Sequence, residues 1–327
     1  MYEPAFRRVE ARLAQSGLAV EPLVMDADGD VRLRGAPADL AHAPPDAGWL
    51  GADVFTGPVR AFCVALLKAP ALRWVQSGSA GVDDPVFAKL AAKGAALTTS
   101  TAQSDAIAEF VLAAALDHLG RGPERREAQA QRRWAPLPFR EVAGTTWLIL
   151  GFGSIGQAVA ARARAFGARV TGVRRNPDPH PAADRLIRPD ALAGALPEAD
   201  VVVLSAPLTA ATEDIADARF FAAMKPGALF VNVARGRLVD EAALLAALGR
   251  GAPGHAVLDV FRQEPLPSDS PWWAHPQASV TAHAAAIGDG RAARGDALFL
   301  DNLARFVRGE PLLHVATAEQ LTPGDRG

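Results

Sequence analysis

The chain has 327 residues, 50% of them hydrophobic, and a formal net charge of −2, so it is long enough for two domains of ordinary size. This charge gives no basis for binding nucleic acid or an anionic membrane surface, and the single cysteine, Cys63, excludes an internal disulfide framework. We find no secretory signal and no apolar run of the ~18 residues that span a bilayer, and we therefore expect a cytoplasmic protein.

The first 48 residues carry the weakest pattern. We expect a helix over 6–16, a strand over 18–25 and a loop over 36–47, which contains three prolines. From residue 48 the pattern sharpens, and strands alternate with helices: strand 48–50, helix 57–67, strand 73–76, helix 87–93 and strand 96–99.

Strand 73–76 ends in a run of small residues, Ser77-Gly78-Ser79-Ala80-Gly81-Val82. Small side chains leave backbone N–H groups unobstructed, and such a nest can hold a carboxylate. A plain loop rich in small residues explains the run equally well. Both interpretations therefore stay open on this stretch alone.

Apolar residues recur at helical spacing from 104 to 119 and predict a long helix. Gly120, Gly122 and Pro123 end it, and we place a candidate domain junction here. Residues 124–142 are charged and show no periodicity, so we expect them to be irregular.

A glycine motif, Gly151-Phe152-Gly153-Ser154-Ile155-Gly156, separates a predicted strand at 147–150 from a predicted helix at 157–166, and a second strand follows at 168–173. Gly151 permits a tight turn, Gly153 lets backbone amides approach a pyrophosphate, and Gly156 lets helix and strand pack closely. The phosphates of a dinucleotide would lie at the helix N-terminus. A methyl-donor cofactor site is the main competing interpretation.

The residues after the second strand bear on the choice of cofactor. A cofactor with a free ribose 2′-hydroxyl requires an acidic residue there, but this chain has Arg174 and Arg175. Guanidinium groups bind phosphate in a bidentate manner, so the pair favours NADP(H), with NAD(H) possible. Two solvated arginines in an arginine-rich chain are the alternative.

Alternation continues to the end of the chain, and it predicts an α/β fold with a parallel, doubly wound sheet whose ligands bind at the C-terminal strand ends. The expected strands are 200–205, 228–233, 255–260 and 278–282, and the expected helices are 190–196, 220–224, 240–248 and 291–308. The tail from 317 is polar, and we expect it to fray.

Unusual polar residues follow three of these strands: Arg235, Glu264 and His283. Arg235 is placed to clamp a carboxylate through its forked guanidinium. His283 differs from the other six histidines because it alone lies at a strand end among small residues. The spacing of Asp259, Glu264, His275 and His283 matches no metal signature, so we expect no metal site.

From about Trp49 to Leu312 the chain resembles the D-isomer-specific 2-hydroxyacid dehydrogenases. The resemblance rests on motifs in family order: QSGSAGVD, GFGSIG, SAPLT, VNVARGRLVDEAAL, DVFRQEPL and TAHAA. It implies two Rossmann-like domains with a cleft between them. Residues 1–102 plus 288–327 would form the substrate domain, and 103–287 an inserted dinucleotide-binding domain. It also implies a homodimer that uses the 104–119 helix region.

The resemblance also implies roles for matching residues. Arg235 would bind the substrate carboxylate and polarise its carbonyl, His283 would act as acid/base, and Glu264 would hold His283. Other matching positions contact the substrate (Ser79, Ala80, Gly81, Val82) or the cofactor (Ser205, Ala206, Pro207, Thr212, Val233, Ala234, Asp259, with the glycine motif, the two arginines and His283).

Arg174 departs from the usual acidic residue and is similar to the NADP-using glyoxylate/hydroxypyruvate reductase branch. Ala282 replaces the usual proline, with little expected effect. The sequence therefore predicts an NADP(H)-dependent reductase that converts small 2-oxo acids to D-2-hydroxy acids. An NAD-dependent dehydrogenase with another substrate, a non-catalytic nucleotide-sensing relative and a methyltransferase are the alternatives.

Overall fold

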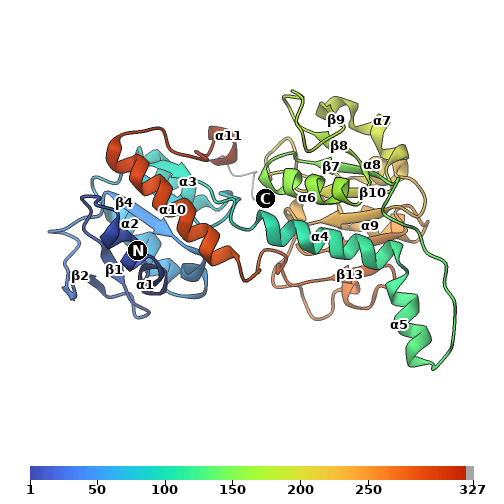
Figure 1. The fold of residues 1–327 in the computed structure, drawn as a ribbon, viewed down its shortest axis with the longest axis horizontal. Coiled ribbons are helices and arrows are strands. Elements are labelled where there is room, and N and C mark those ends of the chain that lie inside the picture. Colours follow the sequence, from blue (N-terminus) through green and yellow to red (C-terminus); the bar gives the residue numbers. More distant parts are fainter. Residues whose placement is uncertain (322–327) are drawn as a thin grey trace. The chain divides into compact units, whose positions relative to one another are not determined.

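The computed structural model describes residues 1–321 and divides the chain into two compact units (Figure 1). Unit 1 comprises Met1–Gln103 and Asp289–Gly327, and unit 2 comprises Ser104–Gly288. No helix in the described part of the chain is long and apolar enough to cross a membrane.

Unit 2 contains a seven-stranded sheet in the order β13-β12-β11-β10-β7-β8-β9, and every neighbouring pair is parallel. This arrangement confirms the doubly wound α/β prediction. The strands are β7 (Thr146–Leu150), β8 (Arg169–Val173), β9 (Arg185–Ile187), β10 (Val201–Leu204), β11 (Leu229–Asn232), β12 (His255–Leu258) and β13 (Ala278–Val280).

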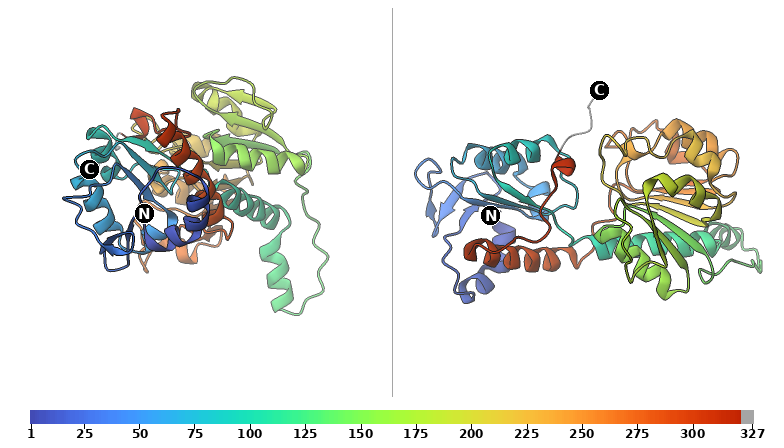
Figure 2. Two further views of the ribbon diagram at one scale, coloured as in Figure 1. Left: turned by 60° about the vertical axis from the view of Figure 1, so that its left-hand side comes forward. Right: turned by 90° about the horizontal axis from the view of Figure 1, so that it is seen from above.

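Helices cover both faces of this sheet (Figure 2). Because successive strand side chains point to opposite faces, Leu148 and Val202 pack with α8 (Ala218–Ala223) and α9 (Glu241–Leu248). Ile149 and Val203 pack on the other face with α4 (Ser104–Leu119) and α6 (Ser154–Ala165). Burial on both faces explains why these strands read as continuous apolar runs.

Unit 1 contains two three-stranded sheets. The parallel one has the order β4 (Ala47–Leu50), β5 (Trp74–Ser77), β6 (Ala96–Thr98), and the antiparallel one joins β1 (Leu23–Met25), β2 (Val31–Leu33) and β3 (Ala36–Pro37). The helices of this unit are α1 (Glu3–Gln15), α2 (Val59–Lys68), α3 (Pro85–Ala92), α10 (Arg291–Arg308) and α11 (Ala318–Leu321).

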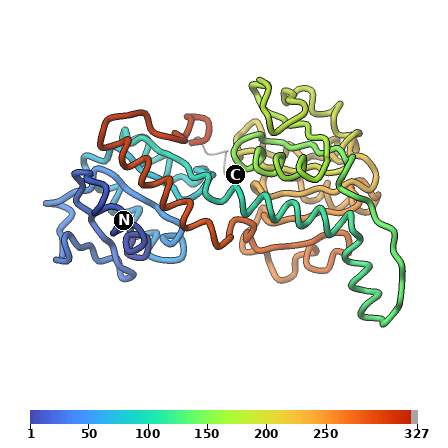
Figure 3. Tube along the Cα trace, in the orientation of Figure 1, coloured from blue at the N-terminus to red at the C-terminus, as the bar shows by residue number. Residues whose placement is uncertain are grey.

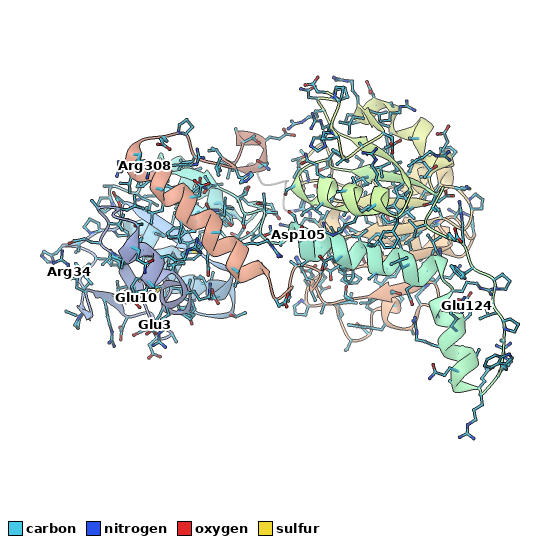
Figure 4. All side chains as sticks on the ribbon, in the orientation of Figure 1. Glu3, Glu10, Arg34, Asp105, Glu124 and Arg308 are labelled. Carbon is cyan, nitrogen blue, oxygen red and sulfur yellow. The ribbon has the colours of Figure 1, made fainter. Side chains whose placement is uncertain are left out.

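Several local predictions were wrong. Only the last three residues of the expected strand 18–25 form β1, and β2 and β3 form a hairpin that we did not predict. Arg34 and Gly35, both with positive φ, make its two-residue turn; Arg34 is labelled in Figure 4. The short edge strand β9 was also missed, because three residues give no usable period.

The segment 124–142 is not wholly irregular, because α5 (Gly122–Ala130) forms there. Pro123 lies in its first turn with Glu124, which is labelled in Figure 4. The helix was missed because only Ala128 is buried, so it has no apolar stripe to recognise. Figure 3 shows α5 and the returning chain projecting from the rest of unit 2.

The prediction of a frayed tail was wrong for residues 318–321, which form α11. The remainder of that predicted tail, residues 322–327, lies outside the described residues.

Candidate active site

His283 and Glu264 are hydrogen-bonded at the carboxyl edge of the unit 2 sheet. His283 Nδ1 lies 2.8 Å from Glu264 Oε2, and both side chains are partly exposed, at 47% and 37%. The other carboxylate oxygen of Glu264 accepts the N–H of Phe261 at 2.9 Å. This pairing fixes the imidazole through Nδ1 and leaves Nε2 as the nitrogen that can exchange a proton with a ligand.

The charge of Glu264 is stabilised by its surroundings. Burial tends to raise the pKa of this carboxyl group. The hydrogen bonds from His283 and from the Phe261 N–H, with the charges of His283 and Arg235, outweigh burial and lower the pKa overall. Glu264 is therefore ionised at neutral pH and presents a carboxylate to the imidazole.

Asp259 shapes the turn that carries His283. It is 2% exposed, and its carboxylate accepts the Thr281 hydroxyl at 2.6 Å and the N–H groups of Ala284 and Ala285. Its backbone carbonyl accepts the N–H of His283 at 2.8 Å. These bonds hold His283 at a φ of 52°, which is uncommon for a residue other than glycine. Asp259 thus acts on the turn, and its role as a cofactor contact stays a prediction.

Arg235 follows β11, where a buried amide fixes the backbone. Asn232 is 1% exposed; its Oδ1 accepts the N–H of Ala234, and its Nδ2 donates to the carbonyl of Arg235. A Cβ on Gly236 would come within 1.9 Å of Phe261 C, so only glycine lets these two strand ends approach so closely. Sequence reasoning did not identify Asn232, although a polar residue ending the buried strand Leu229–Asn232 was visible.

The glycine turn after β7 has the tight geometry expected at Gly151 and Gly156. Gly151 has a φ of +90°, and a Cβ there would lie 2.4 Å from the backbone of Ala206; a Cβ on Gly156 would lie 2.2 Å from Gly151 O. In contrast, a Cβ on Gly153 would have no neighbour within 4 Å. Gly151 and Gly156 are therefore required for packing, and Gly153 adjoins open space at the start of α6. Among residues 1–321 no side chain caps this helix N-terminus, so its first N–H groups are available to an anion.

The other members of the motif differ in accessibility. Phe152 is 3% exposed and packs in the core, so only its backbone can face a ligand. Ser154 and Ile155 begin α6 and are partly exposed. The expected contacts Ser205, Ala206, Pro207 and Thr212 lie in the loop after β10; the Ser205 hydroxyl donates to Gly151 O at 2.7 Å, and Thr212 donates to Pro207 O at 2.7 Å. Val233 and Ala234 follow β11 and are buried.

Arg174 and Arg175 begin the loop after β8. The guanidinium of Arg174 donates to the carbonyls of Asn176 and Asp178, and Arg188 donates to the carbonyl of Arg175. Arg175 is exposed. No carboxylate accepts a hydrogen bond from Arg174 in the described structure, and the role of the two arginines as cofactor contacts stays a prediction.

The run Ser77–Val82 forms a compact loop in unit 1. The Ser79 N–H and hydroxyl both lie against Ser77 Oγ, at 3.1 and 2.9 Å, and Gly78 donates to Leu50 O at 2.6 Å. Within residues 1–321 the N–H groups of Ala80, Gly81 and Val82 have no acceptor. Three adjacent amides without an acceptor favour an anion-binding nest over a plain loop.

The structure gathers Arg235, Glu264 and His283 at one edge of the unit 2 sheet, with the glycine turn and the two arginines at the carboxyl ends of its strands. Residues 79–82 belong to unit 1. Among the described residues no three His, Cys, Asp or Glu side chains cluster so as to hold a metal ion.

The family model named "D-isomer specific 2-hydroxyacid dehydrogenase, NAD binding domain" matches residues 112–285. The chain is 34% identical over 187 residues to glyoxylate/hydroxypyruvate reductase A of Serratia proteamaculans, covering 57% of this chain and 60% of that relative. It is 37% identical over 208 residues to glyoxylate reductase of Thermococcus gammatolerans, covering 61% of this chain and 62% of that relative. The chain thus spans less than two thirds of the length of both.

Among solved structures, a D-isomer specific 2-hydroxyacid dehydrogenase from Xanthobacter autotrophicus, described in complex with NADPH and MES, is similar over nearly the whole chain. The TM-score is 0.77 at 31% sequence identity, with 95% of this chain and 94% of that chain covered.

Proposed function

The chain belongs to the D-isomer-specific 2-hydroxyacid dehydrogenase family, and we propose that it is an NADP(H)-dependent reductase of small 2-oxo acids. Its products would be D-2-hydroxy acids, and glyoxylate and hydroxypyruvate are the leading substrates because the relatives above carry those names. The observation that carries the proposal is the 2.8 Å contact between His283 and Glu264 at the edge of the sheet.

Reduction of a 2-oxo acid needs a hydride at the carbonyl carbon and a proton at the carbonyl oxygen. A reduced nicotinamide supplies the hydride when it is bound. His283 supplies the proton from Nε2, because Nδ1 is committed to Glu264. The Glu264 carboxylate fixes the tautomer and stabilises the imidazolium before transfer, and the reverse reaction uses the neutral imidazole as base.

The substrate carboxylate is assigned to Arg235. Its planar guanidinium can bind a carboxylate with two parallel hydrogen bonds, and its backbone is held by Asn232. Unit 1 has an amide nest of its own at Ala80, Gly81 and Val82, which also suits a carboxylate.

The dinucleotide is assigned to the turn at Gly151–Gly156. The open space beside Gly153 and the uncapped start of α6 fit a pyrophosphate. Arg174 and Arg175, at the end of β8, suit a ribose 2′-phosphate, and the similar Xanthobacter structure is a complex with NADPH. These features support NADP(H) over NAD(H).

We also propose a homodimer formed through α4 and the adjoining segment. Leu116 is 42% exposed, Phe139 58% and Trp134 98%, and such apolar side chains favour burial against a partner. Light scattering coupled to size exclusion tests this: a monomer mass at micromolar concentration would overturn it.

To test the proposed function, the rates of NADPH and NADH oxidation are measured with each of four 2-oxo acids: glyoxylate, hydroxypyruvate, pyruvate and phenylpyruvate. We expect faster turnover with NADPH than with NADH. Preference for NADH would support an NAD-dependent dehydrogenase with the same fold. Tight NADPH binding without turnover of any acid would favour a non-catalytic nucleotide sensor, and binding of a sulfonium cofactor without nicotinamide binding would favour a methyltransferase.

A further inference from the structure

Unit 1 contains a groove between its two sheets that no described residue fills. Its volume is about 570 Å³. Residues 19–23 and Met25 line one side and residues 43–49 the other, so the groove runs between β1 and β4. β4 is an edge strand that pairs only with β5, and β1 pairs with β2 on its far side.

Met1 already pairs with β1 as a residue of a parallel strand would. Its amino group donates to Leu23 O at 2.6 Å, and its carbonyl accepts the N–H of Met25 at 2.9 Å. Met1 is thus bonded to Leu23 and Met25, the residues on either side of Val24, which it faces. One residue bonded to both neighbours of the residue opposite is the pattern of a parallel ladder. The next residue, Tyr2, makes a parallel bridge to Met25. The register and direction of an additional strand in the groove are therefore fixed at one end.

The opposite wall presents unpaired backbone. Asp46 O accepts from Arg73, and Leu50 O accepts from Gly78, so these residues of the β4 segment face β5. Because hydrogen-bonding groups alternate along a strand, those of Ala47 and Trp49 face the groove. An edge of this kind is a template for a further strand.

Apart from Arg73, which pairs with Asp46 at 2.7 Å, the other residues that line the groove are apolar. Phe62 and Leu66 of α2 contribute from one core cluster, and Phe299 and Leu303 of α10 contribute from another. A strand here would be covered on both faces, so its side chains must be apolar at successive positions. A strand matching the four residues of β4 spans ~13 Å at ~3.3 Å per residue.

We propose that this groove accepts an apolar β-strand of about four to five residues, parallel to β1 and joined in line to the amino group of Met1. The strand joins the two sheets into one, in the order β3-β2-β1-strand-β4-β5-β6. The environment of Met1 agrees with this. Its amino group is enclosed, and burial lowers the pKa of the ammonium to about 5, whereas a peptide bond at that position carries no charge.

The test compares the 327-residue chain with three versions that carry five extra residues before Met1: Val-Ile-Val-Leu-Val, Gly-Ser-Gly-Ser-Gly and Val-Ile-Pro-Leu-Val. We expect the first to raise Tm by at least about 5 °C and to slow hydrogen exchange at Ala47 and Trp49. The Gly-Ser version lacks apolar side chains, and the proline version is equally apolar but lacks one ladder N–H. Neither should reproduce the effect.

Equal Tm values for the first and third versions would overturn the proposal, since apolar character alone would then explain any gain. Unchanged Tm and exchange with all three would overturn it as well. Extension-dependent dimerisation, detected by light scattering, would overturn the in-line assignment and show that the groove takes the strand of a second copy. None of these outcomes depends on the proposed enzymatic activity.

Discussion

The backbone N–H of His283 donates to the carbonyl oxygen of Asp259 at 2.8 Å, while the Asp259 carboxylate accepts the N–H groups of the next two residues. A single buried side chain at the end of β12 therefore holds the turn that carries the proposed acid/base. This relationship explains how a histidine with a φ of 52° is kept in one orientation without a proline before it.

We predict that Asp259→Ala lowers kcat by at least about 100-fold and also lowers Tm. The substitution leaves the Thr281 hydroxyl and two amides without their acceptor, at about 1–3 kcal/mol for each unsatisfied group. Steady-state kinetics and thermal unfolding measure both effects. Asp269→Ala removes an exposed carboxylate and serves as the control. Wild-type kcat in Asp259→Ala would show that the turn does not need this carboxylate.

Glu264→Gln is expected to lower kcat for 2-oxo acid reduction by at least about 10-fold. Glutamine can still accept a hydrogen bond from Nδ1 of His283, the proposed proton donor, but it removes the negative charge that faces the imidazole. Steady-state kinetics with NADPH and glyoxylate measure the change, and His283→Asn should lower kcat further because it removes the proposed proton donor. Wild-type kcat in Glu264→Gln would show that the charge of this carboxylate is not needed.

The parallel unit 2 sheet could be predicted because its central strands β7, β10 and β11 are buried on both faces and read as apolar runs. Arg235, Glu264 and His283 were expected at one sheet edge because each follows a strand of this sheet, and the carboxyl ends of parallel strands lie together. In contrast, α5 and the β2–β3 hairpin were missed, because neither buries a periodic apolar face.

The supporting interactions of the site were less visible. Asn232 and Asp259 act through bonds to backbone groups that are adjacent only in the folded chain, and no sequence spacing encodes those partners. The groove beside β4 was not predicted either, since it depends on where two separate sheets end in space.

Replacing Arg174 and Arg175 together with alanine should raise KM for NADPH by about 10- to 100-fold and leave KM for NADH nearly unchanged. Their guanidinium groups are assigned to a 2′-phosphate that only NADPH carries. Arg169→Ala is a matched control, because Arg169 is exposed at the opposite end of β8. An equal rise for both cofactors would instead indicate a structural effect on the loop.

Arg235→Lys keeps the positive charge but loses the planar fork. We therefore expect KM for the 2-oxo acid to rise at least about 10-fold and kcat to fall, with little change in NADPH affinity measured by fluorescence. Arg237→Lys, two residues along and paired with Glu213 at 2.7 Å, controls for a general change in this loop. If both variants keep wild-type kinetics, Arg235 does not bind the substrate.

The buried amino group of Met1 predicts a stability change between pH 6.5 and 8.5. Its pKa is about 5 when folded, against 8.0 for an exposed terminus, so over this range the unfolded chain binds more protons. Stability therefore rises with pH, by about 2 kcal/mol over the window, and is level above it. Burial also lowers the pKa of His118 and His255, and these groups add a smaller rise that fades within about one pH unit above the ordinary histidine value of 6.5. Urea unfolding at the two pH values measures the change, and joining Val-Ile-Val-Leu-Val to Met1 should remove the larger part of it because the ammonium becomes an amide. The same slope in both proteins would assign the pH dependence to other groups.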